Sequence, residues 1–356
     1  MSTVGNKHAL IVLLRLYAAS LALPLMAITG AFVVSGLIIQ LAGYDAPLAL
    51  GALFRGALGS SYSLSETVVR SCPLLLTGLA VSFAFRCGVW NIGAEGQFLA
   101  GALAAAWAAP WLAELPGWLG VPLTLGVGLL AGTLLGGLAA FLKVWRNAQE
   151  VITTIMLNFT AIQLVSYAVH GPLMEDAGQF PQSNPIAEVL RLSRWLPPTR
   201  IHTGVILALV MVVGFYILLF HTVFGFRVRA AGVNPIAARA AGLNVPAAMI
   251  GAMGVSGAIA GLAGAVELTG VTYRLYEDFG SGYGYTAIGV ALLGRLSPSG
   301  VVLAALLFAA LETGASAMQR TANVSAVLVY VIQAMVLLFV VSAMAYERYR
   351  SQRSAA

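Results

Sequence analysis

Charged residues are scarce in this sequence. Of 356 residues, only 9% are Asp, Glu, Lys or Arg, whereas 60% are hydrophobic and the mean hydropathy is +0.90. An ordinary soluble domain is about 25% charged. So few charges cannot cover a water-soluble fold of this length, which argues against a soluble enzyme, a disordered tail and a nucleic-acid-binding protein. The composition predicts an all-α, polytopic integral membrane protein.

Cysteine is almost absent as well. Cys72 and Cys87 are the two cysteines. They lie on one predicted helix, about 22 Å apart at about 1.5 Å per residue. That separation is too large for a disulfide, so both are predicted to be small, apolar packing residues.

Several motifs of catalysis and nucleotide binding are missing. The sequence contains no GxxxxGKS/T phosphate loop, no HExxH and no GxSxG. We therefore expect no catalytic residue, no metal ligand and no bound cofactor in this chain. The histidines lie at predicted membrane edges, which favours interfacial positions over ligand roles; they are His8, His170, His202 and His221.

Long apolar runs are what the sequence has instead. Ten segments are predicted to be membrane helices: 16–41, 67–86, 96–113, 119–142, 151–170, 201–222, 246–270, 283–295, 299–315 and 325–345. A span needs about 20 residues, so the short segment 283–295 is predicted to be a broken or re-entrant helix. The run that begins at Leu16 is too long for the apolar core of a signal peptide, and it is predicted to be an uncleaved first span.

The distribution of charge predicts the orientation. With both termini in the cytoplasm, the inner segments hold 12 of the 19 Lys and Arg residues, as the positive-inside rule expects. Ten spans divide into five and five, and an odd number per half is the geometry of an inverted repeat. We expect one transmembrane domain over 1–356, with an outer loop at 172–200 and an inner loop at 223–245.

Glycine is abundant and partly patterned. Gly128, Gly132 and Gly136 repeat every four residues, as do Gly257 and Gly261. Small-residue faces of this kind let helices approach closely in lipid. These glycines are therefore predicted to pack helices together.

A polar cluster stands between two apolar segments at RCGVWNIGAEGQFLAG, residues 86–101. Asn91, Glu95 and Gln97 lie among glycines there. Polar groups at membrane depth are costly and usually face a pathway, and glycines permit a helix break whose free amides can meet a polar ligand. The residues alone leave two interpretations open, a translocation pathway and a polar inner turn with a solvated Glu95.

This motif resembles the FNIGAEGQ signature of the ABC importer permeases for nucleosides and simple sugars, a group within the branched-chain amino-acid and ribose permeases. Trp90 stands where that signature has Phe. The similarity continues in order along the chain, in PLLLTGLAVSFAFRCGVWNIGAEGQ (73–97), EVITTIMLN (150–158), HGPL (170–173), FPQS (180–183) and ALLGRLSPSGVVLAALLFAAL (291–311).

The inner loop is cationic and rich in alanine. Its stretch RAAGVNPIAARAAGL (229–243) resembles the AAxxxG core of the loop by which importer permeases dock into their ATPase, with Ile236 where the better-known form has Glu. A short helix that starts at Pro235 could lie in a cleft of a cytoplasmic partner; a solvated positive-inside loop is the other interpretation. The resemblance assigns docking to Arg229, Gly232, Asn234, Pro235, Ala237, Ala238, Arg239 and Gly242.

Two further polar stretches are candidates for the pathway. Asn158, within EVITTIMLNFTAIQL (150–164), has an amide that needs partners; an interhelical hydrogen bond is the other interpretation. Tyr283 and Tyr285 belong to the aromatic, glycine-rich stretch 273–289. Its rings could stack on nucleobases or form an aromatic belt at the outer interface.

The resemblance implies the permease subunit of an ABC importer in the bacterial plasma (inner) membrane, which moves nucleosides or simple sugars inward by ATP-driven alternating access. The implied partners are a cytoplasmic ATPase that binds the ATP, a second permease subunit that is usually a different chain, an extracytoplasmic substrate-binding protein and the lipid bilayer; nucleic acid is not expected. The alternative is an autonomous secondary transporter or channel. Such proteins usually carry ionisable residues within their spans, whereas here nearly all charges lie at predicted edges.

Overall fold

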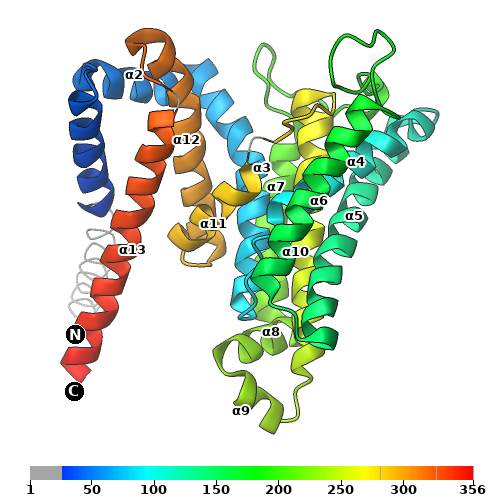
Figure 1. Ribbon diagram of the computed structural model, residues 1–356, viewed down its shortest axis with the longest axis vertical. Coiled ribbons are helices and arrows are strands. Elements are labelled where there is room, and N and C mark those ends of the chain that lie inside the picture. Colours follow the sequence, from blue (N-terminus) through cyan, green and yellow to red (C-terminus); the bar gives the residue numbers. More distant parts are fainter. Residues whose placement is uncertain (1–25, 281, 326, 356) are drawn as a thin grey trace, which may run out of the picture. The chain divides into compact units, whose positions relative to one another are not determined.

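The computed structural model describes residues 26–280, 282–325 and 327–355, with side chains as far as residue 343 (Figure 1). Every regular element within these ranges is a helix, which confirms the all-α class. After a first helix at Met26–Leu41, the elements are α2 (Ala46–Leu58), α3 (Ser61–Arg86), α4 (Ala94–Leu112), α5 (Gly117–Arg146), α6 (Glu150–His170), η1 (Glu188–Leu190), α7 (Thr203–His221), α8 (Val223–Val233), α9 (Pro235–Ala240), α10 (Val245–Glu267), η2 (Leu268–Thr272), α11 (Tyr283–Leu293), α12 (Pro298–Ala322) and α13 (Val327–Ala355).

Six of the described helices are long and apolar enough to cross a membrane. They are α3, α5, α6, α7, α12 and α10 together with η2. Shorter apolar helices occur at Met26–Leu41, α2, α11 and Val327–Ala343. The described chain therefore confirms a multi-pass helical protein, whereas the count of ten spans and the cytoplasmic termini stay predictions. Lys7 and Arg15, which support that orientation, lie outside the described residues.

The chain packs as two compact units. The larger one is formed by residues 61–310, and the smaller by the residues up to Ser60 together with those from Leu311 onward. Neither the single domain over 1–356 nor the inverted repeat of five and five spans is tested by this division, and both stay predictions.

In the smaller unit, α2 packs closely on α12. A Cβ at Gly56 would lie 3.3 Å from the Gly314 Cα and against Ala317. The α2 helix is missing from the predicted segments because its 13 residues are too few for a span and include Arg55. Its start does carry a recognisable signal, since Asp45 accepts a hydrogen bond from the Leu48 amide at 2.9 Å as an N-cap.

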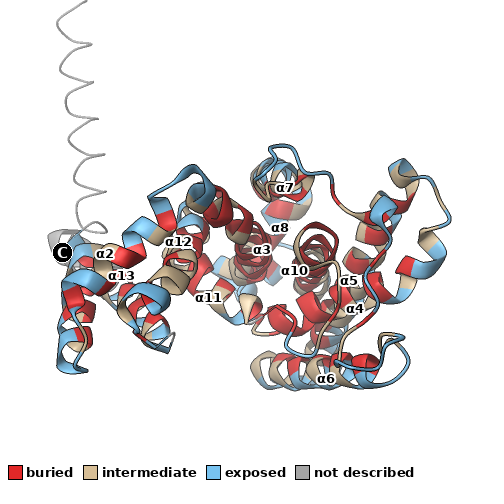
Figure 2. Cartoon of the chain, turned by 90° about the horizontal axis from the view of Figure 1, so that it is seen from above, coloured by how far each residue is buried: buried red, intermediate tan, exposed pale blue. Residues whose placement is uncertain are grey.

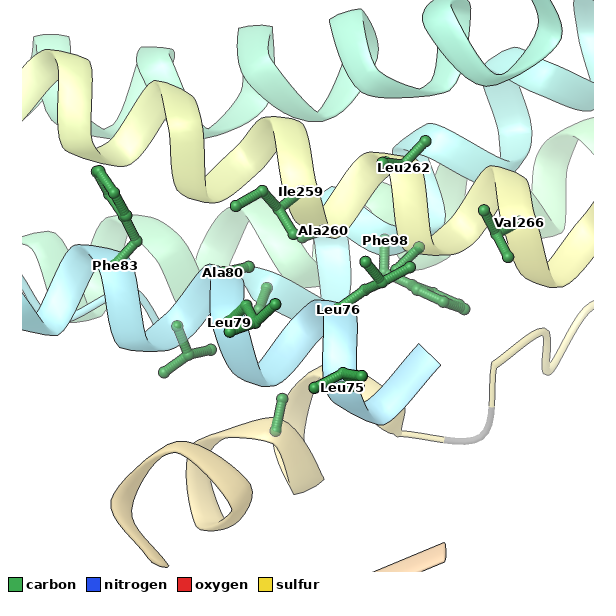
Figure 3. Packing of buried hydrophobic residues seen from close by; sticks show 14 of the residues in the cluster. Leu75, Leu76, Leu79, Ala80, Phe83, Phe98, Ile259, Ala260, Leu262 and Val266 are labelled. Carbon is green, nitrogen blue, oxygen red and sulfur yellow. The ribbon is translucent and has the colours of Figure 1, made fainter. Parts of the chain in front are cut away.

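The core of the larger unit lies around α3 and α10. In the most apolar 18-residue stretch of each helix, 83% of α3 and 67% of α10 are buried, against 22% of α7. Figure 2 shows the buried residues gathered on α3 and α10. Leucine and phenylalanine side chains of α3 and Phe98 of α4 pack there against small and branched residues of α10 (Figure 3). The helices with exposed apolar faces surround this core.

Glycines bring α4, α5 and α10 into backbone contact. A Cβ at Gly132 of α5 would lie 2.7 Å from the Gly261 Cα of α10, and one at Gly136 would lie 2.5 Å from the Met253 carbonyl oxygen. A Cβ at Gly101 of α4 would likewise lie 2.5 Å from the Gly261 Cα. The predicted packing role of the patterned glycines is confirmed. We call this contact the glycine seam; it comprises Gly101, Gly128, Gly132, Gly136, Gly257 and Gly261.

Two expectations about single residues have different outcomes. Cys72 and Cys87 are free and buried, as predicted. His202 differs from its expected interfacial position, because it is only 1% exposed and caps α7. Its Nδ1 accepts a hydrogen bond from the Gly204 amide at 3.1 Å. An imidazole with an accepting nitrogen can replace the usual Ser or Asp at such a cap.

Candidate functional site

The polar motif folds as a partly buried turn between α3 and α4. The α3 helix ends at Arg86, residues 87–93 are not helical, and α4 begins after Gly93. Gly88 has a φ of +75°, a conformation that costs L-residues with a side chain about 1–2 kcal/mol. We call residues 87–93 the polar turn. It is a helix break inside the larger unit, as the glycine pattern predicts.

Asn91 is the centre of a hydrogen-bond network in the polar turn. Its side-chain amide donates to Gln97 Oε1 at 2.9 Å and to Ser256 Oγ at 2.8 Å. Its Oδ1 accepts from Gln97 Nε2 at 3.1 Å and from the Gly93 amide at 3.0 Å. The Ser256 hydroxyl in turn donates to the Ala80 carbonyl at 2.6 Å. The network therefore joins α3, the polar turn, α4 and α10.

Asn158 holds the other side of the polar turn. Its Oδ1 accepts from the Gly96 amide at 2.8 Å, one of the free donors at the start of α4. Its Nδ2 donates to the Ile92 carbonyl at 2.8 Å and to the Tyr285 hydroxyl at 3.3 Å. Asn158 is fully buried, so these bonds satisfy an amide that would otherwise be costly to bury. The interhelical hydrogen bond that the residues alone allowed is present.

Glu95 connects the polar motif to α11. The carboxylate accepts a hydrogen bond from the Gly284 amide at 2.6 Å, across 189 positions of sequence. That amide lies in the first turn of α11, where free N–H groups and the helix dipole favour a negative charge. Gly284 is required there because a Cβ would fall against the backbone of Ala94 and Glu95. Glu95 is only 4% exposed, so the solvated carboxylate considered from sequence is wrong.

The two tyrosines lie beside these groups. Tyr283 packs edge-on against Phe98, with ring centroids 5.9 Å apart, and Tyr285 is 42% exposed. Phe279 is buried and stacks on Phe98 at 5.7 Å. The aromatic stretch is thus partly core rather than wholly an interfacial belt.

All six predicted pathway residues therefore meet in one region of the larger unit. Asn91, Gln97 and Asn158 have partners within the protein for their side-chain polar atoms, while Tyr285 remains accessible. This arrangement holds the helix break in a defined geometry. Ser256 and the Gly284 amide are not predicted from the sequence. The signal available for Ser256 is that it is the one serine among the small residues of α10. Contact with a substrate stays a prediction.

The predicted docking loop forms α8 and α9. Asn234 caps α9, since its Oδ1 accepts from the Ile236 and Ala237 amides at 3.0 Å each. Pro235 is the first residue of α9, as predicted. Ile236 is 78% exposed, while Ala238 is buried. The α9 helix is thus packed on the protein through Ala238 and exposes the apolar side chain of Ile236.

The ends of the predicted docking loop have distinct surroundings. Gly242 has a φ of +80°, which ends α9, and Arg239 is exposed. Arg229 faces the protein instead, with its guanidinium carbon 5.1 Å from the centre of the Phe220 ring. Of the two arginines predicted to dock, Arg239 is therefore the exposed one.

Gly232 connects α8 to the end of α3. A Cβ there would fall on the Arg86 carbonyl, and a Cβ at Gly88 would lie 3.4 Å from the Gly232 Cα. The Arg86 side chain donates from Nε to the Leu296 carbonyl at 3.0 Å, in the turn between α11 and α12. The predicted docking loop, the polar turn and the turn after α11 therefore meet at Arg86.

Residues 63–341 match the family described as branched-chain amino acid transport system / permease component. The chain is 37% identical to a glucose ABC transporter permease of Haloferax volcanii, over 92% of this chain and 88% of that protein. It is 36% identical to a guanosine ABC transporter permease of Bacillus subtilis, over 91% and 94%.

A nucleoside ABC transporter permease of Lactococcus lactis is 32% identical, over 89% of each chain. No solved structure matches this chain. The matched residues include the polar turn, α8, α9, α3 from residue 63 onward and the other five candidate spans. The chain therefore belongs to the permease family of branched-chain amino-acid transport systems, and it is a multi-pass transport protein of the bacterial plasma membrane rather than an enzyme.

Proposed function

We propose that this chain is the transmembrane permease subunit of an ATP-binding-cassette importer, which moves nucleosides or simple sugars inward by ATP-driven alternating access. The relatives named for guanosine, nucleosides and glucose support this substrate range. The observation that carries the proposal is the contact of α8 with Arg86. It connects a surface suited to a cytoplasmic ATPase with the buried helix break.

The α9 helix is the element that receives the ATPase. Its cap by Asn234 and its buried Ala238 fix it on the protein, while Ile236 and Arg239 stand outward for an apolar and a charged contact. An amphipathic helix that lies in a groove is a common mode of protein recognition. The ATPase is a separate chain and binds the ATP.

Movement of the ATPases then reaches the polar turn directly. Because Gly232 has no side chain to absorb a displacement, a shift of α8 acts on the backbone of Arg86 and Gly88. The polar turn begins at that point, and its hydrogen bonds to Asn158 and Ser256 hold one arrangement until they are exchanged for another. Alternating access requires such an element with two discrete states.

The other partners follow from the same proposal. A second permease subunit of a different sequence completes the pathway, and an extracytoplasmic binding protein delivers the substrate at the end of the larger unit away from α8 and α9. The alternative, a secondary transporter or channel, needs no contact at α9. That difference makes α9 the place to test the proposal.

The first experiment measures substrate uptake. Cells with and without this gene are given labelled adenosine, guanosine, uridine, ribose or glucose, and the labelled nucleosides are also given with excess unlabelled ribose or glucose as competitor. Loss of nucleoside uptake in the deletion, insensitive to the sugars, supports a nucleoside importer. If uptake of every nucleoside and of both sugars is the same in the two strains, the proposed substrate range is wrong.

The second experiment tests docking with a matched pair of variants. Ala237→Arg adds bulk and charge to the exposed face of α9, and Gln149→Arg adds the same group at another exposed turn, between α5 and α6. We expect Ala237→Arg to lose uptake and copurification with the ATPase at unchanged membrane abundance, while Gln149→Arg keeps both. Full uptake by Ala237→Arg would favour the autonomous transporter.

A further inference from the structure

A charged cavity lies at the end of the larger unit away from α8 and α9. Its volume is about 290 Å³, close to the lower limit of about 300–1,000 Å³ for small-molecule sites. Helix α3 lines it with three residues of neighbouring turns, and the chain before α7, the end of α10, η2, the segment after η2 and the start of α11 complete it. The polar lining residues are Glu66, Arg70, Arg200, Glu267, Tyr276 and Tyr283.

One oxygen of Glu66 has no partner. Oε2 lies 3.5 Å from Arg200 Nη1, whereas Oε1 is buried and accepts no hydrogen bond. The residue as a whole is only 9% exposed. A buried carboxylate oxygen without a donor costs free energy. Because Glu66 lines the cavity, a ligand there that brings a donor to this oxygen would remove that cost.

The two arginines of the cavity differ in how many partners they have within the protein. Arg200 is held in place, since its Nη2 also donates to the Val271 carbonyl at 3.2 Å. Arg70 follows Glu66 by one helical turn and is half-buried, and it takes part in no ion pair of the described residues. An unused acceptor and an unused set of donors therefore lie on neighbouring turns of one rigid helix.

The lining charges balance. Two carboxylates, Glu66 and the 7%-exposed Glu267, face two guanidiniums, Arg70 and Arg200. An anion such as a nucleotide would meet both carboxylates, and a cation would meet both arginines, each at a desolvation cost. The balance favours a neutral ligand that offers hydroxyl donors and oxygen acceptors together.

We propose that this cavity binds the hydroxylated ring of a neutral sugar, as the ribose of a nucleoside or as a free hexose. Adjacent hydroxyls donate to Glu66 Oε1 and to Glu267, and ring or hydroxyl oxygens accept from Arg70. Hydrogen bonds with one charged partner are roughly twice as strong as neutral ones. The inference rests on the proposed function and adds a binding site to it.

The tyrosines complete this chemistry. The pKa of the Tyr276 phenol is raised, first by burial and then by the negative charges of Glu267 and Asp278. Its hydroxyl therefore stays protonated and able to donate at neutral pH. Tyr283 joins the cavity to α11, at the turn whose next amide binds Glu95. A ligand in the cavity would therefore lie against Tyr283, the residue next to Gly284, whose amide donates to Glu95 of the polar motif.

Equilibrium binding to the purified full-length protein in lipid nanodiscs tests the proposal. Tritiated guanosine and tritiated glucose are the probes, without the binding protein. We expect excess ribose or glucose to displace at least one of them, and guanosine monophosphate and leucine to compete poorly. Displacement by leucine and not by sugars would overturn the neutral-sugar assignment in favour of a zwitterion. A complete lack of probe binding would overturn the site.

Matched variants place the binding in this cavity. Glu66→Ala and Arg70→Ala should each weaken probe binding about tenfold or more, since a hydrogen bond to a charged group contributes about 1.5–3 kcal/mol. Glu188→Ala, which breaks the exposed ion pair with Arg191 outside the cavity, should leave binding unchanged. Unfolding temperatures of all three variants are measured to show that they fold.

The outcomes separate this inference from the proposed function. If the wild-type transporter takes up nucleosides or sugars but Glu66→Ala and Arg70→Ala bind the probe normally, the cavity is not the site and the importer remains. If uptake is absent altogether, the proposed function fails first. A raised KM for uptake at unchanged maximal rate in Arg70→Ala would agree with a binding role.

Discussion

The glycine seam gives a prediction whose size follows from the structure. In Gly132→Ala, the new Cβ would lie 2.7 Å from the Gly261 Cα, while ordinary contacts begin at 3.4 Å. Helices α5 and α10 must therefore separate by at least 0.7 Å at this point, the difference between those two distances. The atoms that must move are backbone, so no rotamer change relieves the contact.

The neighbouring helix position provides the control. A Cβ at Gly137 meets nothing within 4 Å, so Gly137→Ala gains the helix propensity of alanine without a clash, up to about 1 kcal/mol. Gly132→Ala has the same propensity gain but also overpacks the interior, which typically costs about 1–3 kcal/mol. The difference between the free energies of unfolding of the two variants isolates the cost of overpacking the glycine seam.

The protein carries its own reporter for this measurement. Both thiols are buried in the folded state, and burial raises the pKa of the Cys87 thiol to about 11, which keeps it unreactive. A thiol-reactive fluorophore in detergent solution therefore reports unfolding on heating. Gly132→Ala should unfold roughly 2–12 °C below Gly137→Ala, at about 2–4 °C per kcal/mol for a unit of this size. Equal unfolding temperatures would refute the backbone contact between α5 and α10.

Three further predictions concern single residues. Asn91→Leu leaves the Gln97 side chain and the Gly93 amide without a partner, removes one donor to Ser256, and should lower the free energy of unfolding by about 2–4 kcal/mol in a denaturant titration; a loss as small as that of an exposed residue would contradict the network. Burial lowers the pKa of His202 from 6.5 to about 4, so the unfolded state binds the proton more tightly and stability should fall as pH drops from 6.5 toward 4. A His202→Asn variant keeps a capping group and should lose that part of the pH dependence of thermal unfolding. Asn234→Ala removes the cap of α9 at a cost of about 1 kcal/mol, whereas Asn234→Asp retains it; ATP-dependent uptake should fall in the first variant only, and equal uptake by both would show that the cap does not matter for coupling.

Local signals in the sequence predicted much of the fold. The α3 helix ends at Arg86, where the apolar segment 67–86 ends, and α9 starts at Pro235. The α3 helix starts at Ser61, six residues before the predicted segment 67–86, because its first turns carry polar residues and the charged Glu66. That carboxylate is buried through its pairing with Arg200, 134 residues away, which no local pattern reveals.

The candidate site, too, is predicted by local signals only in part. Asn91, Gln97 and Asn158 are recognisable because amides are costly within apolar segments. Their geometry depends on Ser256 and on backbone groups such as the Gly96 and Gly284 amides, which any residue could provide. Long-range partners of this kind follow from the packing of whole helices, so the sequence indicates which residues need partners but not which atoms serve them.

The loop after α6, predicted to be the outer loop, is attached through its main chain. The Ser183 amide donates to the Leu275 carbonyl at 2.7 Å, and the Leu192 amide donates to the Thr269 carbonyl at 2.9 Å. Main-chain bonds do not depend on which side chains the loop carries. Evolution can therefore replace outward residues such as Phe180 and Trp195, which are 60% and 59% exposed, without detaching the loop. The side chains on the outward face of this loop can therefore vary with whatever the loop meets, while its main-chain attachment to the helices is retained.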